Sequence, residues 1–431
     1  MKRTPFPYPS LTSLFPLAPL LFVGGLASCI DTIDLGDVVA EQYREELYIE
    51  GSILSGATSV FHVQRAVPMN ANERDLVTTA TIRIVSDMGF VSDAATLDDD
   101  GAYVIPTGTL NSAERYKMVA EVEGETYESD YLTLADPVPI DSVYFEGHAS
   151  EYLGSNLWTK PSVEIKVDAH APNDASRYYM WTFDEDFEFH APYDLSENLR
   201  DPHGLMPMFD PAQWPGVERY GANPYYYCWV HNTSTSYELY NTEALTENRV
   251  KGHTIATFKR GVAWATTDDL SPRFSHLYAV TVHQSVLDSA AYSYFRTMEQ
   301  YTEEMGGLFS PTPQDLHGNI HCTTHPDKRA HGHIIASATS SYRAFLTNSE
   351  LRALYGVNVS YQPATERRKT PDNGAWVKEC RDNIEWGNVV GVLEPDNVLT
   401  GEYIYPRICY DCLRERGATK QKPEWWPTDE E

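Results

Sequence analysis

Residues 115–134, RYKMVAEVEGETYESDYLTL, decide the fold class of this chain. Apart from Val119, the first eight residues alternate polar and apolar side chains, and EGET (123–126) is a turn signal between this run and the next. Alternation with a period of two buries one face of a strand, so the stretch predicts a β-hairpin. Four earlier runs have the same character and are closed by turn residues: LYIEGSIL (47–54), SVFHVQRAV (59–67), TATIRIVSD (79–87) and GAYVIP (101–106). The mainly β pattern predicts an antiparallel β-sandwich of the immunoglobulin or transthyretin type over residues 47–136.

The chain changes character near Pro137. DPVPIDSVYFE (136–146) carries two prolines in an extended stretch, as a linker entering a new strand would. We therefore expect a second, larger β-rich domain over residues 137–431. Its strand-like runs are SVEIKVDAH (162–170), SRYYMWTFDEDFEFHAP (176–192), CWVHNTSTSYELYN (228–241) and HLYAVTVHQSVL (276–287).

One prominent α-helix is expected within this second domain, at about residues 288–305. Asp288 or Ser289 can cap its N-terminus, and Gly306 and Gly307 follow its end. Apolar side chains recur at helical spacing between the cap and the glycines. We interpret this stripe as a core-facing surface.

The N-terminus has the order of a secretory signal. Lys2 and Arg3 precede a mostly apolar run from Leu14 to Val23, which ends in Leu26-Ala27-Ser28-Cys29. The last four residues resemble the bacterial lipobox, in which the thiol is acylated and the peptide is cleaved before it. We therefore expect a signal peptide at 1–28, lipidation at Cys29 and a tether at 29–46, with a secreted protein or a cytosolic one as the alternatives.

Composition limits the class of partner. The chain of 431 residues carries 62 Asp and Glu against 33 Lys and Arg, a formal net charge of −29. So acidic a surface repels nucleic acids and anionic lipid headgroups, so we expect no nucleic acid partner. Tyr and Trp are abundant, with 28 and 9 copies, and a minority can form an exposed stacking surface. The candidate binding surface comprises Trp214, Tyr225, Tyr226, Tyr227 and Trp229.

Five cysteines follow Cys29, and in an exported protein they are expected to pair where geometry permits. CYDC (409–412) allows a local disulfide between Cys409 and Cys412, half a metal site or a redox dithiol. Cys322 has Cys228 or Cys380 as a candidate disulfide partner. The spacing does not choose between these alternatives.

Histidines are densest in LHGNIHCTTHPDKRAHGHII (316–335). Imidazoles are good zinc or copper ligands, and a hairpin can bring several together. The alternative is a polar hairpin with solvated histidines, so no cofactor is predicted beyond a candidate zinc ion. The candidate metal ligands are His317, His321, His325, His331 and His333.

DEDFE (184–188) is rich in carboxylates, and Asp184, Asp186 and Glu188 fall on one face of the expected strand. They suit either a calcium site or an exposed acidic strand edge that discourages aggregation. No G-x-S-x-G, H-E-x-x-H, Walker or dinucleotide-binding pattern occurs, so no catalytic residue is predicted.

An ordered set of blocks along the chain resembles a known family. The blocks are CIDTIDL, ELYIEGSIL, PVPIDSVYFE, YYMWTFDEDFEF, CWVHNTS, YAVTVHQSVLDSAAYSYFRTMEQYTEEMGGLFSPTPQDLHGNI, GHIIASATSSYRAFL and CYDCLRERGATKQKPEWWP. Together they resemble a family of Bacteroidota outer-membrane lipoproteins known as a domain of unknown function (4249). The chain departs from the family pattern in its proline-interrupted signal and in an insertion, DPHGLMPMFDPAQWPGVERYGANPYYY (201–227).

The resemblance implies a β-rich lipoprotein, often encoded beside TonB-dependent outer-membrane receptors, and carries no established catalytic residues. We therefore expect a non-enzymatic binding or accessory protein, lipid-anchored in the outer membrane and facing the cell exterior, with a TonB-dependent receptor as candidate partner in nutrient uptake. The alternatives are a secreted metal-dependent hydrolase built on the 317–333 histidines and a structural envelope protein.

Overall fold

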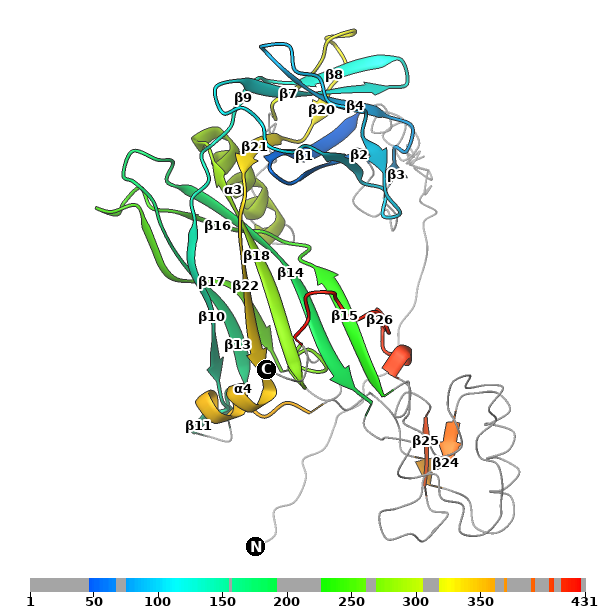
Figure 1. The fold of residues 1–431 in the computed structure, drawn as a ribbon, viewed down its shortest axis with the longest axis vertical. Helices are drawn as coiled ribbons and strands as arrows, with labels where there is room; N and C mark the ends of the chain where they lie inside the picture. Colours follow the sequence, from blue (N-terminus) through cyan, green and yellow to red (C-terminus); the bar gives the residue numbers. More distant parts are fainter. Residues whose placement is uncertain are drawn as a thin grey trace, which may run out of the picture.

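The computed structural model describes residues 46–66, 75–154, 157–191, 226–260, 269–304, 318–360 and 412–427, and short strands at 368–369, 389–391 and 403–406. The fold is mainly β and its sheets are largely antiparallel, which confirms the predicted class. Figure 1 shows two β bodies, one above the other, with helix α3 (Ser289–Glu304) near their junction and helix α4 (Asn348–Tyr355) at the far end of the second body.

The first body is a sandwich of two sheets. One sheet has the order β20-β1-β2-β6-β5, with β21 on β1 and β3 on β2, and the other has the order β19-β8-β7-β4, with β9 on β7. The predicted hairpin is β7-β8, closed by Glu123 and Gly124 at φ values of 52° and 84°, the left-handed conformation that two-residue hairpin turns require. The strand bounds are β1 (Leu47–Ser55), β2 (Thr58–Arg65), β3 (Asp75–Leu76), β4 (Thr81–Ser86), β5 (Thr96–Leu97), β6 (Tyr103–Pro106), β7 (Arg115–Val122), β8 (Glu125–Ser129), β9 (Leu132–Thr133), β19 (Ile320–Cys322), β20 (Ala330–His331) and β21 (Ile334–Ala338).

Three strands of this sandwich come from far along the chain. β20 and β21 pair in parallel with β1, and β19 pairs with β8. The sequence analysis assigns all three to a second domain beginning at residue 137. In the structure they instead pair with edge strands of the first body. This pairing satisfies backbone groups that an exposed sheet edge would leave without partners. Gly332 permits the close approach: at φ +104°, a Cβ there would lie 1.9 Å from the carbonyl oxygen of Ile49.

The second body packs the sheet β22-β18-β14-β15-β26, with β16 on β14, against the sheet β10-β13-β17. Its core holds large side chains from both sheets, among them Trp181 and Tyr278 from the first and Phe145 and Ile165 from the second. The strand bounds are β10 (Ile140–His148), β13 (Ser162–His170), β14 (Tyr178–His190), β15 (Tyr227–Thr233), β16 (Glu238–Asn241), β17 (Arg249–Lys259), β18 (Leu277–Leu287), β22 (Ser340–Thr347) and β26 (Ala418–Thr419). Smaller elements are β11 (Tyr152–Gly154), β12 (Leu157–Trp158), β23 (Arg368–Lys369), β24 (Val389–Gly391), β25 (Tyr403–Pro406) and the short helix η2 (Cys412–Arg414).

A buried ion pair lies inside this second core. The guanidinium of Arg273 donates two hydrogen bonds of 2.6 Å to the carboxylate of Glu185, whose side chain is 4% exposed. The Tyr278 hydroxyl donates to the same carboxylate at 3.0 Å, and Asn232 Nδ2 donates at 2.8 Å. Burial and the neighbouring carboxylate raise the pKa of Tyr278 well above its usual value. The network satisfies a charge that would otherwise be costly to bury.

Helix α3 confirms the helix predicted at about 288–305. Asp288 caps it, since its Oδ1 accepts a 2.7 Å hydrogen bond from the backbone N–H of Ala291. Helix α4 is not predicted, because its eight residues follow a strand-like run. Its signal is the capping box between Thr347 and Glu350, with Gly356 at the C-cap. Within the described residues, no helix is long and apolar enough to cross a membrane.

Candidate functional site

Three carboxylates lie along one face of β14, at every second residue, as the sequence predicts. Each of them contacts a histidine, with nitrogen–oxygen distances of 2.9, 2.9 and 3.0 Å for the pairs Asp184–His283, Asp186–His231 and Glu188–His190. Calcium prefers a shell of oxygen ligands, so a row of carboxylate–imidazole pairs does not suit it. The acidic-edge interpretation is wrong, because β14 is an interior strand that pairs with β18 on one side and with β15 and β16 on the other.

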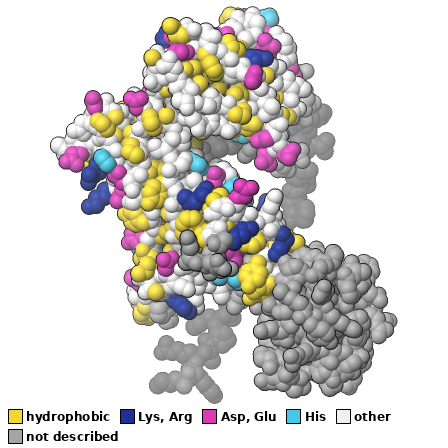
Figure 2. All heavy atoms as spheres, in the orientation of Figure 1, with side chains coloured by type: hydrophobic (Ala, Val, Ile, Leu, Met, Phe, Trp, Pro, Cys, Tyr) yellow, Lys and Arg dark blue, Asp and Glu magenta, His cyan; other side chains and the backbone are white. Residues whose placement is uncertain are grey.

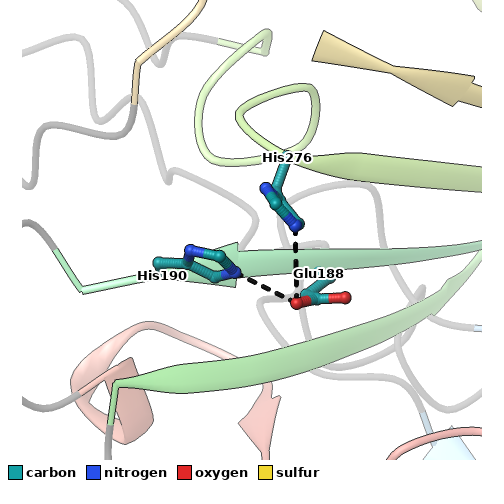
Figure 3. Close-up of side chains that lie close together, drawn as sticks. All are labelled: Glu188, His190 and His276. Carbon is teal, nitrogen blue, oxygen red and sulfur yellow. Dashed lines mark hydrogen bonds and ion pairs between the residues drawn. The ribbon is translucent and has the colours of Figure 1, made fainter. Parts of the chain in front are cut away.

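Glu188 has a second histidine beside it (Figure 3). Its Oε1 lies 3.0 Å from Nε2 of His190 and 3.7 Å from Nε2 of His276, and the three donor atoms lie within 4.8 Å of one another. Burial raises the pKa of Glu188, but the hydrogen bond from His190 and the charge of His276 outweigh it, so the pKa is lowered. The carboxylate is therefore ionised at neutral pH, and the cluster is a donor set that can hold a metal ion.

Aromatic side chains surround this cluster. The indole Nε1 of Trp426 donates a 3.0 Å hydrogen bond to Oε2 of Glu188. The His190 ring lies 5.1 Å from the ring centroid of Tyr226 and 4.4 Å from that of Tyr227. These contacts fix the orientation of the carboxylate and of one imidazole.

A surface pocket of about 620 Å³ lies further along the same face, between β14, β15, β18, β22 and the C-terminal segment. The Arg343 guanidinium stacks 3.6 Å from the centroid of the Trp425 ring, which also lines the pocket. Trp229 lines it as well, and the buried indole N–H of Trp229 has no acceptor among the described residues. Figure 2 shows acidic, basic and apolar side chains interspersed over the described part of the face that it draws. The pocket therefore offers both stacking and hydrogen-bonding groups.

A disulfide between Cys228 and Cys412 fastens the C-terminal segment beside this face. The local Cys409–Cys412 pairing is therefore wrong for Cys412, and Cys409 lies outside the described residues. Pairing of Cys322 with Cys228 is also wrong, because β19 buries Cys322 as a free thiol in the first body while Cys228 lies in the core of the second. The other candidate partner of Cys322, Cys380, lies outside the described residues.

The predicted aromatic surface is brought together in part. Tyr226 and Tyr227 contact His190, and Trp229 lines the pocket two residues further along β15. Trp214 and Tyr225 lie outside the described residues.

The histidines of residues 317–333 do not come together where the structure describes them. His321 contacts Asp130 at 3.1 Å, His325 contacts Glu125, and His331 contacts Glu46 at 2.8 Å. His333 is 7% exposed, and its ring stacks on that of Tyr294 at 4.8 Å. Gly332, at φ +104°, stands between His331, the last residue of β20, and His333, which lies outside that strand. His317 lies outside the described residues.

The sequence gives no sign that His276 and Trp426 lie beside Glu188. Glu188 and His190 stand two residues apart in one strand, which places them on one face and is visible in the sequence. His276 lies 86 residues after His190, and Trp426 lies 238 residues after Glu188. Only strand pairing and the disulfide bring these two side chains near the carboxylate.

A comparison with protein-family models matches residues 35–343 to the family described as "Domain of unknown function (DUF4249)". The comparison with curated proteins gave no match.

Proposed function

The chain belongs to the family described as Domain of unknown function (DUF4249), and from this premise we propose that it is a lipid-anchored binding protein of the outer membrane, exposed at the cell surface. The observation that carries the binding role is the pocket along β14, which Trp229, Trp425 and Arg343 line together with the carboxylates of Asp184 and Asp186. Tryptophan rings and a small number of convergent polar groups are typical of ligand sites.

The anchor is supported by the lipobox-like Leu26-Ala27-Ser28-Cys29 and by the tether expected after it. Cys29→Ser is expected to abolish acylation and to move the protein from the membrane fraction to the soluble one. Fractionation of the native cells, with metabolic labelling by a fatty acid, measures both effects. Retention of Cys29→Ser in the membrane would contradict the anchor. Protease treatment of intact cells then tests exposure, since a protein on the inner face stays protected.

The candidate partner is a TonB-dependent receptor in the same membrane, which is supported by the resemblance of the ordered sequence blocks. The test is affinity purification of the intact protein from its own membrane in mild detergent, followed by mass spectrometry. Stoichiometric recovery of such a receptor is the expected result. Recovery of the protein alone would contradict the partnership and favour a structural envelope role.

A matched pair of variants locates the binding surface. Arg343→Ala removes the guanidinium that stacks on Trp425 in the pocket, and we expect it to lower recovery of the partner. Arg352→Ala removes the same charge from the exposed surface of α4 and is expected to leave recovery unchanged. Equal recovery with both variants would place the partner interface away from the pocket.

A further inference from the structure

We propose that Glu188, His190 and His276 form a binding site for a divalent transition-metal ion, with zinc as the ion that the donors fit best. Two imidazole nitrogens and one carboxylate oxygen are a ligand set that zinc uses in proteins, with a fourth position left for water or another ligand. This site is separate from the 317–333 histidines and does not depend on the receptor partnership.

The distances between the donor atoms suit the ion. In a tetrahedral zinc site with bonds of about 2.0 to 2.1 Å, neighbouring ligand atoms stand about 3.3 Å apart. The separations from Glu188 Oε1 to the two Nε2 atoms, 3.0 Å to His190 and 3.7 Å to His276, lie on either side of this value. Shifts of a few tenths of an ångström therefore bring both imidazoles to this distance from the carboxylate oxygen, and the two imidazole nitrogens already lie within 4.8 Å of each other.

The backbone around these donors is held on several sides. Glu188 and His190 stand at the end of β14, where the register pairs them with Leu277 on β18 and Tyr227 on β15, respectively. His276 directly precedes β18, and its carbonyl accepts a 2.8 Å hydrogen bond from the backbone N–H of Asn348. Donors that are already ordered lose little conformational entropy when they bind an ion.

The site is shielded on one side and open on the other. The Glu188 side chain is 12% exposed and that of His190 22%, whereas His276 is 49% exposed. The Trp426 indole donates a hydrogen bond to Oε2 of Glu188, and Oε1 is the oxygen that faces both imidazoles (Figure 3). An ion can therefore enter past His276 and meet a carboxylate whose orientation is already set.

A second cluster of carboxylates and a histidine already has a counter-ion from the protein. Glu146, His148 and Glu164 also bring their donor atoms within 4.8 Å of one another. There, however, the Lys166 ammonium lies 2.9 Å from Glu146 and 3.2 Å from Glu164, and it supplies the positive charge. This second cluster is therefore the matched control.

The test uses the full chain, purified in mild detergent and stripped of metal by a chelator. Titration with zinc chloride at pH 7.5, followed by calorimetry and by metal analysis after gel filtration, is expected to give one tightly bound zinc per chain. His276→Ala and Glu188→Gln are expected to weaken binding at least tenfold, since each removes one of three protein ligands. His148→Ala is expected to leave affinity unchanged. Cobalt(II) in place of zinc reports the coordination geometry through its visible absorption.

Three results would overturn the site: no saturable zinc binding, unchanged affinity in His276→Ala, or an equal loss in His148→Ala. Other histidines are tested by the double variant His321→Ala with His325→Ala, which is expected to bind zinc like the parent. Loss of zinc binding in that variant would assign the ion to strand β19 and the loop that follows it, and would overturn the proposal. His276→Asn, which keeps a polar side chain of similar size, separates a loss of ligation from a loss of folding when its thermal unfolding is compared with that of the parent.

Discussion

The indole N–H of Trp426 donates to Oε2 of Glu188 at 3.0 Å, across 238 residues of chain. Trp426 is 4% exposed, so the contact is held in a packed environment. It fixes which oxygen of the carboxylate is turned toward the two histidines. The C-terminal segment is therefore part of the site on β14.

Replacement of this indole tests its positioning role. Trp426→Phe keeps an aromatic ring but removes the hydrogen bond, so the carboxylate loses its fixed orientation. If the zinc site is correct, affinity is expected to fall about 10-fold to 100-fold, the usual cost of losing a contact that orients a ligand. Zinc titration measures it, and Trp425→Phe, on the neighbouring pocket side chain, is the control. Unchanged affinity in Trp426→Phe would show that the indole does not position Glu188.

The disulfide between Cys228 and Cys412 joins residues 184 apart. Loss of a cross-link that closes so long a loop is expected to cost about 5 kcal/mol of stability in the chain-entropy description, because the unfolded chain gains conformational entropy. The double variant Cys228→Ser with Cys412→Ser should therefore unfold at lower urea concentration than the parent. Cys322→Ser is the control, since Cys322 is a buried free thiol. Dithiothreitol should destabilise Cys322→Ser and leave the double serine variant unchanged, and any other pattern would contradict the pairing.

The buried ion pair between Arg273 and Glu185 predicts a large loss of unfolding free energy when one of the two side chains is truncated. Arg273→Ala leaves the Glu185 carboxylate buried without its counter-ion, which is expected to cost about 3 to 5 kcal/mol of unfolding free energy. Urea unfolding followed by tryptophan fluorescence measures it. Arg352→Ala, an exposed control, is expected to change stability by less than about 0.5 kcal/mol.

A double variant separates charge burial from packing at the same place. Arg273→Met with Glu185→Gln removes both charges and keeps side chains of similar length. We expect this double variant to lose less unfolding free energy than Arg273→Ala alone, because no charge stays buried without a partner. A larger loss would show that the ion pair itself contributes net stability.

Glu125 on β8 predicts a pH dependence of stability in the first body. Hydrogen bonds from Lys328, Thr324 and His325 lower the pKa of this carboxyl to about 2, from an ordinary value of 4.5. Because the folded pKa is below the unfolded one, the stabilisation is complete above about pH 4.5 and is lost as pH falls toward 2. Glu125→Gln should therefore flatten the decline of the unfolding temperature between pH 4.5 and 2.

The control for this titration is Glu121→Gln, an equal change of charge on the exposed face of β7. It is expected to follow the parent profile. An unchanged slope in Glu125→Gln would show that the contacts to residues 324–328 do not hold the ionised carboxyl.

Much of the fold could be predicted because its signals are local. Alternation in residues 115–122 requires a strand with one buried face, and β7 buries Tyr116, Met118, Ala120 and Val122 as that pattern predicts. Asp288 ahead of an apolar stripe predicts helix α3 through the same local logic. The lipobox-like segment ending at Cys29 is local as well, and lipidation there stays a prediction.

The partners of these elements could not be predicted in this way. An alternating run specifies which face of a strand is buried, but not which edge the strand joins, so β21 pairs with β1 although about 280 residues separate them in the chain. The same holds for cysteines, since pairing depends on which strands bring two thiols together and not on their spacing.

The sequence by itself determined the strands, the main helix and the single-face row of Asp184, Asp186 and Glu188, because each depends on neighbours in the chain. Only the tertiary structure decided that His276 and Trp426 meet Glu188 and that the histidines at 321–333 lie apart. Convergence of distant side chains is set by sheet order, register and the Cys228–Cys412 link, and these depend on packing between segments that the chain itself does not place side by side.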